Sequence, residues 1–265
     1  MMKQVNRITK EPHRPFHPTQ RSACCKRSVI TCRSRSPDQN QETLPSATLH
    51  QLYTNQAILM ASASAVLGPL CDNLHSQYHV LTYRHPSISI PDVFETTWWT
   101  PILFGTAGII LGIGVPLLDQ VFSSSSPLPS PPSSSPQPPS WFLVHLCISA
   151  FVLQYFLSAL LDSSNSPYID TILGATALST WLFFDRSPAG LCMSLLTAVC
   201  GPAIEVVLIS KFHLYEYTHA DVFDCIPHWI GFTYFAGGPA VGNLGRRTLA
   251  DLMLMHKVDE RAVLR

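Results

Sequence analysis

Six long apolar segments constrain the fold of this chain more than any other feature. Each approaches the roughly 20 residues that an α-helix needs to cross the hydrocarbon core of a bilayer. Only 13% of the 265 residues are charged, whereas soluble domains carry about 25%. The sequence therefore predicts an all-α polytopic membrane protein with six transmembrane helices. The expected spans are about 55–71, 98–118, 141–161, 167–184, 188–210 and 226–245.

The basic residues predict the orientation of the spans. With six spans, the basic N-terminus, Arg186 and the pair Arg246 and Arg247 all fall on one side of the membrane. By the positive-inside rule both termini face the cytosol, or the stroma if the protein is in a plastid. The formal net charge is zero, so no basic excess indicates a nucleic-acid partner.

The N-terminal region has a composition of its own. Its first 37 residues hold nine Lys and Arg and a single acid, Glu11, among many serines. This composition is typical of a plastid transit peptide, and a disordered basic tail explains it equally well. The expected regions are the N-terminal region 1–54, a six-span domain 55–250 with a Ser/Pro-rich linker at 123–140, and a cytosolic tail 251–265.

The last expected span is crowded with glycine and ends at two arginines. Glycine weakens a soluble helix, but small residues four apart let helix backbones approach closely in lipid. Arg246 and Arg247 are expected to hold the end of this span at the membrane surface. The glycines expected at helix contacts are Gly105, Gly108, Gly238, Gly242 and Gly245.

Three groups of residues could carry chemistry. Cys71, His75, His79 and His85 include a His-x-x-x-His spacing that could hold a metal on a helix, although polar histidines in a loop between two spans are the preferred interpretation. Glu205 lies inside an apolar span, where an ionisable group is costly and often functional. It could bond a ligand hydroxyl or a carbonyl freed by Pro202, or make a structural hydrogen bond between helices.

The third group is the short turn Asp185-Arg186-Ser187 between two spans. Ser187 is expected to cap the following helix, with Pro188 at its first position. The residues alone favour a helix cap and topology anchor. The chain shows no nucleophile motif or paired carboxylates within one span. We therefore expect no catalytic residue, no bound metal and no cofactor.

Several motifs, in matching order over about residues 90–250, resemble the INSIG (insulin-induced gene) family. The basic, serine-rich N-terminus suggests a divergent plant or algal member. The motifs are Pro91-Asp-Val, Trp98-Trp99-x-Pro101, Gly105-Thr-Ala107, Pro116-x-x-Asp119, Trp181-x-x-Phe184-Asp-Arg-Ser187, Tyr215-x-Tyr217-Thr218, Phe235-Ala-Gly-Gly238 and Gly242-Asn243-x-Gly245-Arg246.

The resemblance implies a six-span protein of the endoplasmic reticulum that binds an oxysterol among its helices. Such proteins hold the sterol-sensing domains of SCAP and HMG-CoA reductase. Asp185 matches the family's partner-contact aspartate, and Arg186 lies beside it. Trp181 matches a residue of the ligand pocket, to which we add Glu205. Tyr168 stands where the family has a pocket glutamine and offers one hydroxyl in place of an amide.

Other functions are also compatible with these residues. The chain could be a membrane transporter or carrier whose pathway uses Glu205, or a plastid membrane protein of unrelated role. An enzyme that acts on a lipid would use the histidines His75, His79 and His85. The hypothesis that the residues favour is a non-enzymatic membrane regulator that senses a sterol or another lipid.

Overall fold

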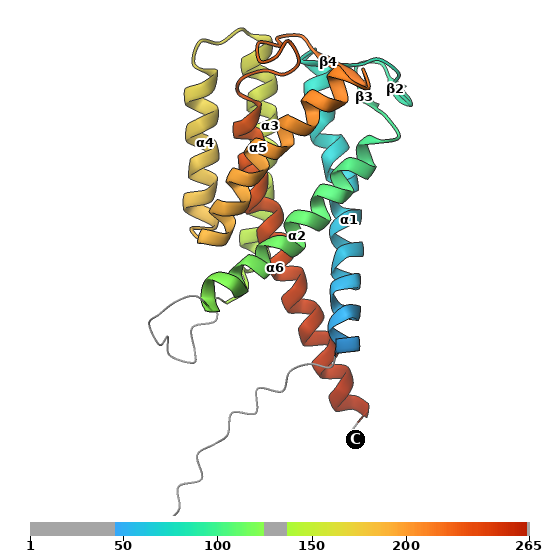
Figure 1. Cartoon of the computed structure of the whole chain (residues 1–265), viewed down its shortest axis with the longest axis vertical. Helices are drawn as coiled ribbons and strands as arrows, with labels where there is room; N and C mark the ends of the chain where they lie inside the picture. Colours follow the sequence, from blue (N-terminus) through green and yellow to red (C-terminus); the bar gives the residue numbers. More distant parts are fainter. Residues whose placement is uncertain (1–45, 125–136, 264–265) are drawn as a thin grey trace, which may run out of the picture. The chain divides into compact units, whose positions relative to one another are not determined.

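The computed structural model describes residues 46–124 and 137–263, which form six α-helices and four short β-strands (Figure 1). Residues 1–45 of the predicted N-terminal region and residues 125–136 of the predicted linker lie outside the described residues. The elements in chain order are α1 (Ser46–Gln77), β1 (Leu81–Tyr83), β2 (Ile88–Ile90), β3 (Phe94–Thr96), α2 (Thr100–Ser124), α3 (Trp141–Ser163), α4 (Ile169–Phe184), α5 (Pro188–Ser210), β4 (Tyr215–Tyr217) and α6 (Ile230–Val263).

Helices α2 to α5 follow the predicted spans closely, whereas α1 and α6 are longer than expected. Helix α1 begins at Ser46, within the region predicted to precede the membrane domain. Helix α6 continues to Val263, through the predicted tail. It continues past its arginines because Leu249 and Leu252 are buried, so one face of the helix still packs on the bundle beyond the predicted end.

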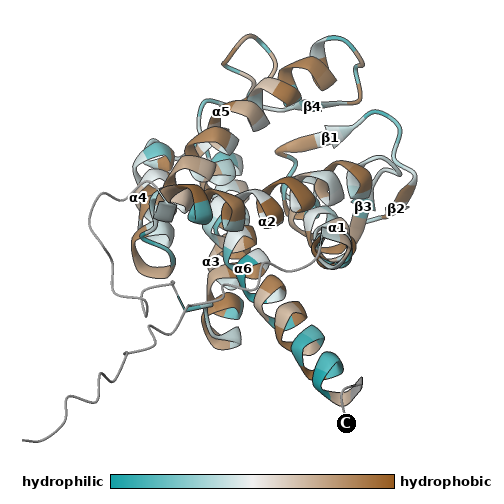
Figure 2. Cartoon of the chain, turned by 60° about the horizontal axis from the view of Figure 1, so that its bottom comes forward, coloured by the Kyte–Doolittle hydropathy of each residue, from teal (hydrophilic) through white to brown (hydrophobic). Residues whose placement is uncertain are grey.

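Apolar length supports a membrane-spanning bundle. Four of the described helices, α1, α2, α3 and α5, are long and apolar enough to cross a bilayer. Helix α4 is apolar but has 16 residues. Figure 2 shows the hydrophobic colouring of the bundle and the hydrophilic colouring toward the C-terminal end of α6. The all-α polytopic class is confirmed, while the count of six spans stays a prediction.

Helix α6 is the centre of the bundle. It contacts each of the other five helices, and Ala236 and Ala240 on it are fully buried. The closest approach is to α2, where a Cβ added to Gly245 would lie 2.0 Å from the carbonyl oxygen of Gly112. Gly108 of α2 also lies close to α1, with the Met60 carbonyl oxygen 2.8 Å from an added Cβ. Small residues at these positions let the backbones touch.

The four strands, which the sequence analysis did not predict, lie together at the end of the bundle opposite the start of α1 and the end of α6 (Figure 1). Strand β1 pairs antiparallel with β4, with Leu81 opposite Tyr217. Strand β2 pairs antiparallel with β3 in a hairpin. The β1–β4 pair joins the segment after α1 to the segment after α5, so the two halves of the chain are tied at this end.

Candidate functional site

The turn between α4 and α5 is built by local sequence. Ser187 caps α5, because its hydroxyl accepts a hydrogen bond from the Gly190 amide at 2.9 Å, and Pro188 occupies the first turn. Both features are as predicted. Arg186 has a φ of 58°, the left-handed conformation that reverses the chain here. The indole nitrogen of Trp181 donates to the Ser187 carbonyl oxygen at 3.2 Å, which holds the last turn of α4 against the start of α5.

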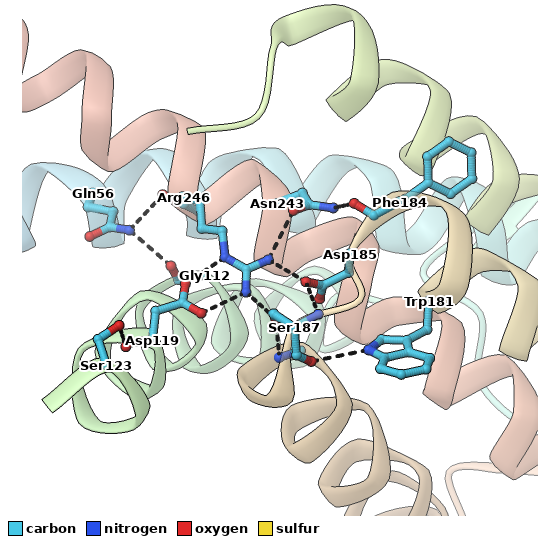
Figure 3. Close-up of polar contacts among 12 residues, drawn as sticks. Gln56, Gly112, Asp119, Ser123, Trp181, Phe184, Asp185, Ser187, Asn243 and Arg246 are labelled. Carbon is cyan, nitrogen blue, oxygen red and sulfur yellow. Dashed lines mark hydrogen bonds and ion pairs between the residues drawn. The ribbon is translucent and has the colours of Figure 1, made fainter. Parts of the chain in front are cut away.

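Arg246 of α6 joins this turn to the end of α2 (Figure 3). Its guanidinium pairs with both oxygens of Asp119, at 2.6 and 2.9 Å, and with Asp185 Oδ1 at 2.9 Å. It also donates to Ser187 Oγ at 2.7 Å and to Asn243 Oδ1 at 3.0 Å. A planar guanidinium suits such a fork of acceptors. We call Asp119, Asp185, Ser187, Asn243 and Arg246 the turn cluster.

Two side-chain amides bond backbone carbonyls beside the turn cluster. Asn243 Nδ2 donates to the carbonyl oxygen of Phe184, the last residue of α4, at 3.0 Å. Gln56 Nε2 donates to the carbonyl oxygens of Gly112 and Gly245, at 2.9 and 3.1 Å. Buried carbonyls that lack a partner are costly. The amides therefore fix α1, α2, α4 and α6 relative to one another at this end.

The structure corrects the role expected of Arg246. Both arginines were expected at the membrane surface, but the Arg246 side chain is only 14% exposed and every nitrogen of its guanidinium is hydrogen-bonded. Arg247 is more open, 27% exposed, and pairs with Asp251 one turn along α6. The partners of Arg246 explain the difference, because two carboxylates from distant parts of the chain meet on its side of the helix.

The two residues predicted to contact a partner differ in access. The Asp185 side chain is 1% exposed and is paired with Arg246. Its other oxygen, Oδ2, lies over Gly190 and has no hydrogen-bond partner among the described residues. Arg186 is exposed, and its guanidinium bonds the carbonyl oxygen of Leu182. Arg186 therefore faces outward, whereas Asp185 supports the turn from inside.

The three residues predicted to line a ligand pocket lie apart. Trp181 is at the turn, while Tyr168 precedes α4 at its opposite end and is 68% exposed. Glu205 of α5 is buried, and it accepts hydrogen bonds from Tyr234 at 2.6 Å and from Tyr217 at 3.0 Å. Glu205 thus makes the structural hydrogen bond between helices that had been weighed against a ligand contact, to Tyr234 of α6, and a second bond to Tyr217 of β4. The pocket role of these three residues stays a prediction.

A groove that the sequence analysis missed runs between α3 and α4. It has a volume of about 180 Å³ and is mostly apolar. Four of its lining side chains are polar, and two of them bond each other. Gln154 Nε2 donates to the Leu173 carbonyl oxygen at 3.1 Å, and Thr176 Oγ1 donates to Gln154 Oε1 at 2.5 Å. The signal was available, because Gln154 is the only amide in an otherwise apolar run. The residues that line the groove include Leu153, Gln154, Thr176, Thr180, Phe183 and Phe184.

The histidines do not gather into a metal site. Among the described residues, no three His, Cys, Asp or Glu side chains are placed to hold an ion. The preferred interpretation of His75 as a polar loop residue was wrong, because His75 lies in α1 and is 1% exposed. Its Nε2 is 2.8 Å from Ser158 Oγ, and its ring packs on Tyr155 and Trp229. His75 is a core residue between α1 and α3.

His228 forms a charged contact at the strand end of the bundle. Its Nε2 lies 3.1 Å from Asp170 Oδ2, and its Nδ1 bonds Asp221. Burial lowers the pKa of His228, but its hydrogen bond to the Asp221 carboxylate and the charge of Asp170 outweigh burial and raise the pKa above its ordinary value. The imidazolium therefore ties the first turn of α4 to the loop before α6.

Comparisons with known proteins agree on one family. The family model described as Insulin-induced protein (INSIG) matches residues 55–249. The chain is 31% identical to Insulin-induced gene 1 protein of Homo sapiens over 200 residues, which cover 76% of this chain and 68% of the human protein. It is 30% identical to the Danio rerio protein of the same name over 204 residues, which cover 76% of each chain.

A solved structure supports the same arrangement of helices. The crystal structure of the mycobacterial Insig homolog MvINS from Mycobacterium vanbaalenii matches with a TM-score of 0.60 at 21% identity. The match covers 74% of this chain and 95% of the mycobacterial protein. At this identity the likeness shows the fold alone.

Proposed function

The chain belongs to the INSIG family, and from this premise we propose that it binds a sterol or another membrane lipid in the groove between α3 and α4 and thereby controls a membrane partner. Family membership makes it a multi-pass membrane protein and a non-enzymatic regulator in sterol homeostasis. The ligand, the partner and the endoplasmic reticulum as location are the proposed parts.

The observation that carries the proposal is the chemistry of the groove. Its lining is apolar apart from a few polar side chains, among them Gln154 and Thr176. Gln154 uses one amide hydrogen for the Leu173 carbonyl, so its second hydrogen can donate to a ligand hydroxyl. An apolar body with one hydroxyl is the chemistry of a sterol. An open groove of about 180 Å³ can cover one face of such a ligand, which leaves the other face to lipid or to a partner.

The groove is directly connected to the turn cluster. Phe183 and Phe184 line it, and the Phe184 carbonyl accepts the hydrogen bond of Asn243. Asp185 follows in the chain. A ligand that packs on Phe184 therefore contacts the residue next to the buried aspartate. We propose that the surface of the α4–α5 turn, where Arg186 is exposed and Asp185 lies behind it, contacts a membrane protein that carries a sterol-sensing domain.

Photo-crosslinking with a clickable sterol tests the ligand part. The wild-type protein should be labelled, and excess hydroxysterol should compete the label away. Gln154→Leu and Thr176→Val should lose most of the labelling. Thr106→Val is the matched control, because Thr106 also bonds its own helix carbonyl but lies on the exposed side of α2. Labelling that hydroxysterol cannot displace, or that both groove variants retain, would refute sterol binding in this groove.

The proposed location has its own test. A fusion of residues 1–55 to a fluorescent protein, beside a fusion of the full chain, should place the full chain in the endoplasmic reticulum. Plastid fluorescence from both fusions would refute that location and would support the transit-peptide alternative for the N-terminal region.

A further inference from the structure

The β2–β3 hairpin has two chemically different faces. Ile88 lies opposite Thr96, Ser89 opposite Glu95, and Ile90 opposite Phe94. Residues that lie opposite each other share a face of a sheet, and neighbours along a strand alternate between faces. Ile88 and Ile90 therefore share one face of the hairpin, and Glu95 belongs to the other.

The polar face is fixed on the end of α1. Asn73 accepts a hydrogen bond from the Glu95 amide at 2.8 Å and donates to the Val93 carbonyl oxygen at 3.1 Å. Ser76 Oγ donates to the Glu95 carboxylate at 2.6 Å. The base of the hairpin is closed by a bond from the Trp98 amide to Ser87 Oγ at 3.1 Å. These contacts set the orientation of the hairpin and leave its apolar side pointing away from α1.

The apolar side is open to its surroundings. Figure 2 shows β2 in the hydrophobic colour at the edge of the molecule. Three large apolar side chains make up this surface, which we call the hairpin face. They are Ile88, 52% exposed, Ile90, 51%, and Trp98, 71%, and Val93 in the turn beside them is also exposed. Contiguous exposed apolar surface on a folded protein marks an interaction site.

We propose that the hairpin face lies in the headgroup region of the bilayer, so that the strand end of the protein is anchored in the membrane surface. The face continues directly into the lipid-facing surface of α2, because Trp98 comes just before that helix and Ile102 and Leu103 on it are also exposed. Tryptophan is enriched at this depth of a membrane.

Charge placement supports the same depth. Asp92, in the turn of the hairpin, is exposed, and a carboxylate is tolerated among headgroups but costly in the hydrocarbon core. Arg84, directly after β1, pairs with Glu216 of β4 at 3.4 Å, and both side chains are about half exposed. The hairpin face itself carries no charged side chain. A surface with apolar residues and a charged tip matches the boundary between lipid chains and headgroups.

Depth-dependent quenching of Trp98 tests the proposal in the full chain reconstituted into phosphatidylcholine liposomes. The emission of Trp98 is obtained as the difference between the wild type and Trp98→Phe. A doxyl quencher placed on the lipid chain near the headgroup should remove a large part of this emission, because an interfacial tryptophan lies at that depth. A doxyl quencher deep in the chain, or iodide on both sides of the membrane, should remove much less.

A second variant tests the same surface without changing Trp98. Ile88→Ser combined with Ile90→Ser changes only exposed side chains, so the protein should still elute as one species. In this variant shallow lipid quenching should fall and iodide quenching should rise, while Ser89→Ala, on the other face, should match the wild type. Strong iodide quenching in the wild type would overturn the proposal. So would protection from both iodide and lipid quenchers, which would indicate a protein partner on the face.

Discussion

Two buried carboxylates of this protein are held in different ways. Asp185, at the turn between α4 and α5, pairs with Arg246, whose guanidinium also takes both oxygens of Asp119. Glu205, inside α5, meets only the hydroxyls of Tyr217 and Tyr234 among the described residues. Buried charges need a partner charge, and buried polar groups need hydrogen bonds. The carboxylates of the turn cluster are therefore stabilised by the opposite charge of Arg246. The Glu205 carboxyl group is stabilised by its hydrogen bonds to the two tyrosines.

The largest effect is expected at Arg246. Arg246→Leu leaves two carboxylates that are 1% and 18% exposed without their partner charge. Breaking a buried ion pair from one side costs about 3–5 kcal/mol, so the midpoint of thermal unfolding in detergent should fall strongly. The control is Arg247→Leu, whose pair with Asp251 spans one helical turn near the surface and is worth about 0.3–0.5 kcal/mol. Equal unfolding midpoints for the two variants would contradict the larger contribution expected of the buried ion pairs of Arg246.

A smaller effect is expected at Glu205. Glu205→Leu leaves the hydroxyls of Tyr217 and Tyr234 without an acceptor, at a cost of about 1–3 kcal/mol. Glu205→Gln keeps one acceptor oxygen and should lose less stability. The midpoint of thermal unfolding is measured for the three proteins. It should be highest for the wild type, lower for Glu205→Gln and lowest for Glu205→Leu. A Gln variant as unstable as the Leu variant would show that the charge of Glu205, rather than its hydrogen bonds, is what matters.

The smallest effect is expected at His228, the charged contact of the strand end. Its pKa is raised in the folded protein, so its stabilising contribution is complete below the unfolded value of about 6.5 and is lost as the pH rises through the folded value. The unfolding midpoint should therefore decline from weakly acidic to alkaline pH. His228→Gln should flatten this decline, and His50→Gln, at an exposed position of α1, should not. A decline that is identical in His228→Gln would exclude His228 as its source.

Local patterns predicted much of the fold. The apolar runs located α2 to α5, and Ser187 with Pro188 marked the start of α5, because span length and helix caps depend on neighbouring residues. The strands have three residues each, which is too short for an alternation of apolar and polar residues to predict a strand. Helix α6 continues beyond Arg246 and Arg247 because Leu252 is buried against the bundle. This tertiary contact could not be predicted from the charges that mark the expected end of the span.

The candidate site was less predictable for a physical reason. The sequence pointed to Asp185 and Arg186, but Arg246 and Asp119 are 127 residues apart, and no local pattern shows that they meet. The groove was missed because its polar residues, Gln154 and Thr176, come from different helices. A single amide in an apolar run was the available sign. Whether such an amide marks a groove depends on which helix lies opposite it, and tertiary packing decides that.

Sterol-dependent capture of a partner tests whether a ligand in the groove between α3 and α4 controls binding of that partner. The full chain, in membranes with and without added hydroxysterol, is used to co-purify a protein that carries a sterol-sensing domain. We expect sterol to increase capture by the wild type. Gln154→Leu should capture the partner at the sterol-free level in both conditions, and Thr106→Val should behave as the wild type. Capture by the wild type that is the same with and without sterol would contradict such control.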